Sequence, residues 1–154
     1  MDLEKLTPVL KSICVAANGA FVGAAFYVLS VEFPALDEHT YGCVLKILRL
    51  EHRHHARMQF GLTVATGLSG VSLYFMNKEK HFPFLVAGSI MLATMPFNKF
   101  AIKPACQPLV KPGAKDEMEE KEVREKVNKL RRLLSVRSVA ALAGFGYLVY
   151  HLTC

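Results

Sequence analysis

Long apolar stretches alternate with charged segments along this chain. A membrane-spanning helix needs about 20 predominantly apolar residues, and four stretches reach or approach that length. They lie at about residues 10–31, 58–75, 82–102 and 133–152. This pattern predicts an all-α fold, an integral membrane four-helix bundle that forms one domain over residues 1–154. A soluble bundle would show amphipathic stripes, whereas three of the four stretches are apolar on nearly all faces.

A charged segment leads into the last of these stretches. Residues 116–132 place Glu120 one helical turn before Arg124, and Glu125 one turn before Lys129. Ion pairs in this order stabilise an isolated helix by about 0.2–0.5 kcal/mol each. We therefore expect an exposed helical extension on the cytoplasmic side that continues into the last span.

Three prolines are expected to end helices, because proline lacks a backbone N–H and its ring clashes with the preceding turn. Pro34 follows the first span, and Pro104 and Pro108 follow the third. Between the first two spans, residues 35–57 predict a polar connector with helical character. Residues 77–81 predict a tight turn into the third span.

Two glycines give the first span a face of small residues. Gly19 and Gly23 lie one helical turn apart, a spacing that lets two membrane helices approach closely. Such a face can join two copies of the chain, or it can pack inside one bundle. We favour the second alternative, because a four-span chain supplies its own partner helices.

The composition and charge agree with a membrane protein. Hydrophobic residues make up 52% of the chain, and its net charge is +6. The excess positive charge lies mostly in the two long connectors, beside apolar stretches. This placement argues against nucleic-acid binding and for a lipid bilayer as the partner. The positive-inside rule then predicts that the long connectors are cytoplasmic and that both termini lie outside or in a lumen.

The four cysteines are isolated from one another. Cys14, Cys43, Cys106 and Cys154 form no C-x-x-C pair, so neither a zinc site nor a thioredoxin-type motif is expected. Free thiols are the favoured state. A disulfide between Cys14 and Cys154 is an alternative, because both residues lie near the same membrane face in the predicted topology.

Ionisable residues at membrane depth are the candidate functional groups. A charge at the centre of a membrane helix costs about 2.5–3.5 kcal/mol on insertion scales and marks a functional site by default. Glu32, Lys99 and Arg137 fall at a common depth on three helices. A histidine run that includes His54 and His55 lies nearby. We expect a polar pocket in which Glu32 pairs with Arg137 or Lys99. Alternatively, the two cations snorkel to lipid phosphates.

Three segments resemble one family of membrane proteins. They are GAAFYVLSVEFPAL (residues 23–36), MPFNKFAIKPACQPL (95–109) and RRLLSVRSVAALAGF (131–145). In this order and with a four-span layout, they resemble the anthrone oxygenase-like family, which is also known as a domain of unknown function. Asn98 stands where the family usually has threonine, Cys106 where it has asparagine, and Leu134 where histidine is common. The positions of the family motifs in this chain are Pro34, Pro96, Asn98, Pro104, Cys106 and Arg137.

The resemblance implies a chemistry. It implies a cofactor-independent membrane oxygenase that converts a small aromatic substrate, an anthrone-type ketone, to a quinone with dioxygen, and no metal is expected. The base would be Glu32, His54 or His55. Lys99 and Arg137 would stabilise the enolate oxyanion.

Two other classes of function are alternatives. One is a non-catalytic scaffold with the same fold, which acts as a homo-oligomer or as an assembly partner of another protein. The other is a carrier of haem or metal that uses the histidines as ligands.

Overall fold

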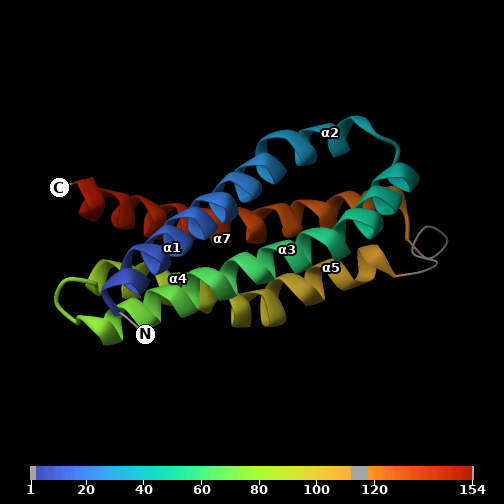
Figure 1. Ribbon diagram of the computed structural model, residues 1–154. Coiled ribbons are helices and arrows are strands. Elements are labelled where there is room, and N and C mark those ends of the chain that lie inside the picture. The colour runs from blue at the N-terminus through green and yellow to red at the C-terminus, as the bar shows by residue number, and fades with distance from the viewer. Residues whose placement is uncertain (1–2, 112–117, 154) are drawn as a thin grey trace.

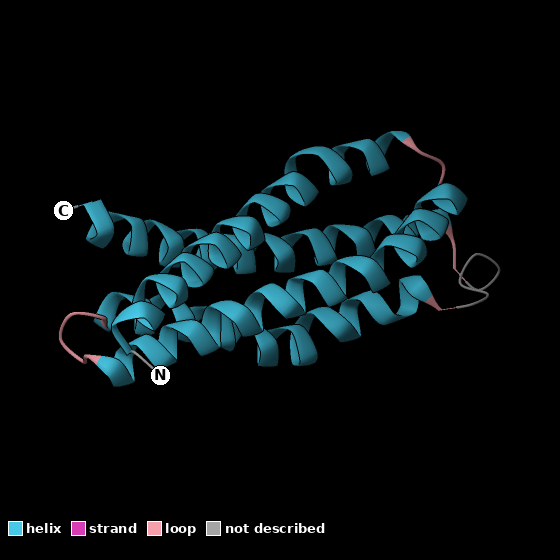
Figure 2. Ribbon diagram, in the orientation of Figure 1, coloured by secondary structure: helices cyan, strands magenta, loops and turns pink. Residues whose placement is uncertain are grey.

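The computed structural model describes residues 3–111 and 118–153. Within these ranges it contains helices and no strands, which confirms the predicted all-α class (Figure 2). The two elements labelled η are π turns inside longer helical stretches. In chain order the elements are α1 (Leu3–Tyr27), η1 (Val28–Glu32), α2 (Phe33–Glu38), α3 (Tyr41–Met76), α4 (Phe82–Phe97), η2 (Asn98–Ile102), α5 (Lys103–Val110) and α7 (Glu120–Thr153).

The long helices run side by side (Figure 1). α3 packs against α1 and α4, and α7 contacts the same two helices. The turn between α3 and α4 lies at the end of the molecule where the N- and C-termini also lie, and the α2–α3 connection lies at the opposite end (Figure 1). The predicted tight turn is confirmed, and in it Asn77 Oδ1 accepts a hydrogen bond from the Lys80 N–H at 3.1 Å.

Three helical stretches are long and apolar enough to cross a membrane. They are Leu6–Glu38, Phe82–Val110 and Glu120–Thr153, and they contain three of the four predicted spans. The remaining predicted span, 58–75, lies inside α3, which is not one of the three stretches. The structure thus indicates a membrane protein, while the four-span bundle stays a prediction.

The two π turns carry their helices past prolines. In η1 the Phe33 N–H bonds to the Val28 oxygen. In η2 the Lys103 N–H bonds to the Asn98 oxygen. These hydrogen bonds span one residue more than those of an α-helix. The wider turn makes room where a proline ring would otherwise clash with the carbonyl of the preceding turn.

The prediction that the prolines end helices is therefore wrong. α2 contains Pro34, and α5 contains both Pro104 and Pro108. The helical character predicted for the connector at 35–57 is confirmed. The connector consists of the end of α2 and the first turns of α3, which begins at Tyr41.

The predicted charged extension is helical from Glu120 onwards. α7 runs without a break from Glu120 to Thr153. Arg124 Nη2 lies 2.9 Å from Glu120 Oε1, as the spacing of the two residues predicts. Residues 116 and 117 of the predicted extension lie outside the described residues.

Buried apolar side chains form separate clusters along the molecule. One cluster joins α2, the first turns of α3, α5 and the first turns of α7, and it includes Leu45 and Val127. Two others lie toward the α3–α4 turn and join α1, α4 and α7. Phe21 and Met91 belong to one of them, and Leu148 to the other.

A close helix crossing joins α3 to α4. A Cβ atom added to Gly70 would overlap the Phe84 carbonyl oxygen, and one added to Gly88 would lie 3.3 Å from the Gly67 oxygen. Only glycine therefore lets the two backbones approach this closely.

The two glycines of α1 have different surroundings. A Cβ atom added to Gly19 would lie 3.3 Å from the Phe145 ring of α7, so Gly19 packs inside the chain. A Cβ atom added to Gly23 would meet nothing within 4 Å. The intrachain packing that the sequence favours thus applies to Gly19 and not to Gly23.

We expect Gly70→Ala to lower the free energy of unfolding by about 1–3 kcal/mol, because the backbone of α4 must shift to admit the methyl group. Gly23→Ala is the matched control, since it adds the same group to a helix where the space is open. Thermal unfolding of the purified protein in detergent compares the two variants. Equal stability would contradict the close α3–α4 crossing.

Candidate functional site

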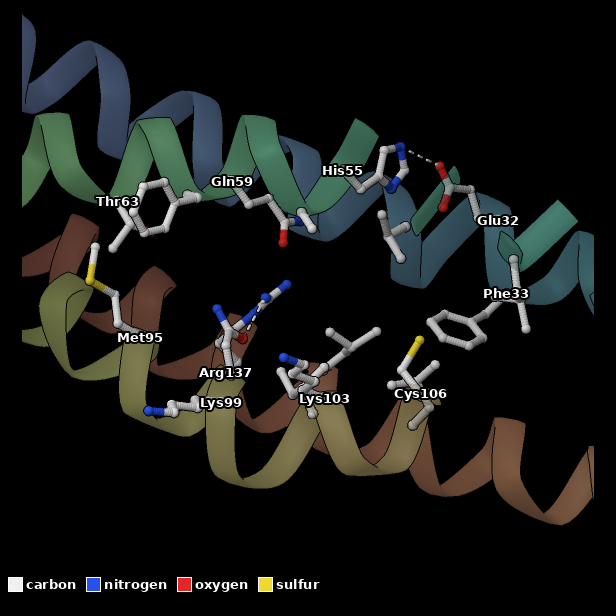
Figure 3. A pocket seen from close by; sticks show the side chains of 18 of the residues that line it. Glu32, Phe33, His55, Gln59, Thr63, Met95, Lys99, Lys103, Cys106 and Arg137 are labelled. Carbon is white, nitrogen blue, oxygen red and sulfur yellow. Dashed lines mark hydrogen bonds and ion pairs between the residues drawn. The ribbon is translucent and has the colours of Figure 1, made fainter. Parts of the chain in front are cut away.

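A cavity of about 640 Å³ lies among the helices (Figure 3). Its wall is formed by η1 and α2, by α3, by the end of α4 with η2 and α5, and by α7. Most of this wall is apolar, and Phe33, Phe60 and Met95 contribute to it. The polar and charged residues that line it are Glu32, His55, Gln59, Thr63, Asn98, Lys99, Lys103 and Arg137.

The two π turns bring corresponding positions to the cavity. A π turn contains one extra residue, so it rotates the side chains that follow it around the helix axis. A residue in the first stretch corresponds to a residue in the second when both lie the same number of positions from their proline, Pro34 or Pro104. The matching pairs that line the cavity are Val28 with Asn98, Glu32 with Ile102, Phe33 with Lys103 and Leu36 with Cys106.

Arg137 of α7 is buried at the cavity wall, with 6% of its surface exposed. Its Nη1 donates a hydrogen bond to Asn98 Oδ1 at 3.0 Å. Its Cζ lies 5.3 Å from the centre of the Phe21 ring, a cation–π distance. The side chain points into the cavity (Figure 3). This placement does not match a cation that snorkels to lipid phosphates.

Glu32 and His55 form a pair on the other side of the cavity. His55 Nε2 lies 3.6 Å from Glu32 Oε1, as the dashed line in Figure 3 shows. Glu32 is the last residue of η1, and His55 lies on α3. A carboxylate beside an imidazole orients the ring, as a general base requires. The sequence predicts Arg137 or Lys99 as the partner of Glu32, whereas the structure places the His55 imidazole beside it.

The other predicted site residues differ in how they are placed. Lys99 lines the cavity but is exposed, and its Nζ lies 5.6 Å from the centre of the Phe100 ring. His54 is exposed and does not line the cavity. The structure thus brings Glu32, His55, Lys99 and Arg137 to one cavity. Of the motif positions, Asn98 and Cys106 also line it, and Pro34, Pro96 and Pro104 do not.

Sequence reasoning misses a buried polar row on α3. Gln59 is 8% exposed, and it points into the cavity (Figure 3). Thr63 and Thr66 follow it along the same helix and are also buried. Their signal in the sequence is the recurrence of polar residues at helical spacing inside an apolar stretch.

The two sides of the cavity differ in charge. One side carries the Glu32–His55 pair, and the other carries Arg137 and Lys103 (Figure 3). Such a separation suits removal of a proton from a ligand at one side and stabilisation of a negative oxygen at the other. Among the described residues, no three His, Cys, Asp or Glu side chains gather as a metal site requires.

The described cysteines form no disulfide with one another. Cys14 and Cys106 are buried, and Cys43 is exposed. The Cys14 thiol lies 3.7 Å from the Thr66 carbonyl oxygen. The alternative of a Cys14–Cys154 disulfide involves a residue that lies outside the described part of the chain.

Comparisons with known proteins give no match, since no protein family, no curated protein and no solved structure matches the chain. The resemblance to the anthrone oxygenase-like family therefore stays a prediction from its motifs. A function has to be inferred from the cavity and the side chains that line it.

We expect Asn98→Leu to lower the free energy of unfolding by about 1–3 kcal/mol, because the buried guanidinium of Arg137 loses its acceptor. Lys99→Leu is the matched control. It removes an exposed side chain from the same π turn and should change stability by less than about 0.5 kcal/mol. Thermal unfolding in detergent measures both variants. Similar losses would show that the Arg137–Asn98 hydrogen bond has no specific effect on stability.

Proposed function

We propose that this protein is a membrane oxygenase that converts an anthrone-type aromatic ketone to a quinone with dioxygen and without a bound cofactor. The observation that carries the proposal is a cavity with the Glu32–His55 pair on one side and Arg137 on the other (Figure 3). Its volume of about 640 Å³ falls within the range of small-molecule pockets, about 300–1,000 Å³. Its mostly apolar wall suits a flat aromatic ring system.

In this proposal the chain crosses the bilayer four times, and α3, which contains the predicted span 58–75, is the second crossing. α3 has 36 residues, so it is about 54 Å long and exceeds the bilayer core of about 30 Å. The α2–α3 connection and the α3–α4 turn lie at opposite ends of the molecule (Figure 1). If α1 and α4 both cross, α3 must return the chain between them. The end of the molecule that holds the α2–α3 connection then lies on the cytoplasmic side, where the lysines and arginines of residues 35–57 and 103–132 favour it.

The first chemical step is removal of a proton from the activated methylene group of the ketone. His55 accepts the proton, and Glu32 orients its imidazole. The negative charge moves to the ketone oxygen, which becomes an enolate oxyanion. Arg137, held in place by Asn98, stabilises this oxyanion.

The second step is reaction of the enolate with dioxygen. The carbanion carbon supplies the electron pair that forms a C–O bond, and protonation gives a hydroperoxide. The base then removes the remaining proton from this carbon, the O–O bond breaks, and water leaves as the carbonyl forms. Dioxygen is the oxidant and the methylene carbon is oxidised. One methylene group and one dioxygen molecule give one carbonyl group and one water molecule.

Oxygen uptake by the reconstituted protein tests this proposal, with anthrone as the model substrate. We expect Arg137→Ala to lower the rate by about 100-fold, because removal of one oxyanion donor costs about 10²–10³ in rate. We expect a loss of similar size for His55→Ala, because general-base catalysis supplies about 10²–10⁴.

His54→Ala is the matched control, since it removes the neighbouring exposed imidazole and should keep the wild-type rate. Unfolding temperatures identify any variant that fails to fold, and Arg137→Lys then replaces Arg137→Ala. A wild-type rate no faster than those of Arg137→Ala and His55→Ala would remove the oxygenase proposal.

A membrane assembly partner is the second candidate function. An outward face of α1 carries the exposed small residues Ala16, Ala20 and Gly23, and the space beside Gly23 is open. Small residues on a membrane helix let another helix approach closely. This face supports association with a second copy or with another membrane protein.

For this candidate we expect Gly23→Leu to convert an assembly in lipid nanodiscs to the monomer without a change in unfolding temperature. The added side chain fills the contact face, and its Cβ atom meets nothing within 4 Å in its own chain. Subunit counting by photobleaching measures the change, and Gly61→Leu on α3, where the space is also open, is the control. A monomeric wild-type protein that also co-purifies with no partner in stoichiometric amount would remove this candidate.

A further inference from the structure

The cavity opens between α3 and the η2–α5 segment. Four of the residues that line it are exposed: Ala56 and Phe60 on α3, Lys99 on η2 and Lys103 on α5. All the others are buried or half-buried. The exposed residues therefore form the mouth of the cavity, and buried residues such as Arg137 form its floor.

Large apolar side chains are exposed beside the lysines of this mouth and on other helices of the cavity wall. Phe60 at the edge of the mouth is 61% exposed, and Phe100, next to Lys99, is 74% exposed. Val31 on η1 and Val136 on α7, each next to a residue that lines the cavity, are exposed too. Large apolar side chains exposed on several helices are typical of a surface that lipid covers. The mouth thus opens sideways toward the hydrocarbon region or its boundary.

The floor of the cavity holds a cation whose donors are not all used. The Nε atom of Arg137 is buried and has no hydrogen-bond partner among the described residues. Almost all buried polar groups have a partner, and the strongest partner for a guanidinium is an anionic oxygen. Lys99 and Lys103 add positive charge at the mouth, which attracts an anion.

We propose that the cavity binds a membrane-dissolved amphiphile that carries one ionised oxygen, phenolic or carboxylic. The ligand enters sideways between α3 and η2–α5, its oxygen binds Arg137, and its apolar body occupies the wall formed by Phe33, Phe60 and Met95. This inference rests on the pocket of the proposed function and deepens it by naming the class of substrate and its route. It concerns binding alone and requires no turnover.

A single tryptophan reports on the cavity, because the chain contains none of its own. Phe60→Trp places the indole at the mouth. Phe26→Trp is the matched control, since Phe26 is 68% exposed on α1 and does not line the cavity. The protein is reconstituted in phosphatidylcholine vesicles and titrated with a bromine-labelled long-chain carboxylic acid, a quencher of tryptophan fluorescence. The methyl ester of the same acid is titrated in parallel.

We expect the acid to quench the Phe60→Trp variant with saturation, while the ester quenches it only in proportion to its concentration in the bilayer. The control variant should show the proportional behaviour with both compounds. Adding Arg137→Met to Phe60→Trp should weaken the binding of the acid at least tenfold, because a charge-assisted hydrogen bond is lost. If that variant fails to fold, Lys103→Met should weaken the binding by a smaller, measurable factor.

Three results would overturn the inference. The first is identical titrations by acid and ester, and the second is saturable quenching of the control variant. The third is displacement of the acid by an equal mole fraction of phosphatidylglycerol in the vesicles, which would assign the site to a phospholipid headgroup. Binding of the acid without any oxygen uptake would remove the proposed oxygenase function and leave this inference standing. Oxygen uptake together with equal binding of the acid and the ester would remove this inference and leave the proposed oxygenase function standing.

Discussion

The buried guanidinium of Arg137 is the constraint on which the rest of this structure depends. A charge in an apolar helix bundle costs several kcal/mol unless other groups replace its water. Asn98 supplies an acceptor from η2, and Phe21 supplies a ring face from α1. Three helical stretches are therefore fixed relative to one another at this level. Arg137 also lines the cavity, and its Nε atom has no hydrogen-bond partner among the described residues.

The prolines and the π turns together determine which side chains face the cavity that Arg137 lines. A proline in a regular α-helix would bend or end the helix, and the side chains beyond it would not lie beside α3 and α7. The π turns instead keep both stretches helical and place Glu32 and Asn98 on their inner faces. Because the two turns have the same relation to Pro34 and Pro104, they form two walls of one cavity. The walls differ mainly in the chemistry of the matched side chains.

The sequence predicts those parts of the fold and of the site that depend on local composition. It predicts the all-α class, the turn before α4 and all ionisable residues of the cavity except Lys103, because apolar length, turn residues and isolated charges are visible in one dimension. It does not predict that helices continue through Pro34 and Pro104, since the compensating π turn has no reliable signal in the sequence. It also cannot separate His54 from His55, because adjacent helical residues differ only in the direction they face.

Apolar packing between several helices stabilises the bundle around the cavity. One apolar cluster, around Leu45 and Val127, includes Phe33 and Cys106 of the cavity wall, and others pack on the side of the α3–α4 turn, around Phe21 and Leu148. Each cluster is formed by several helices, so the bundle is held together around the cavity. A buried charge at the cavity wall is a cost to folding that well-packed apolar residues would not impose. Because the clusters supply the stability, the bundle can keep an unfilled space and an incompletely bonded cation, which are the two properties that a bound anionic ligand requires.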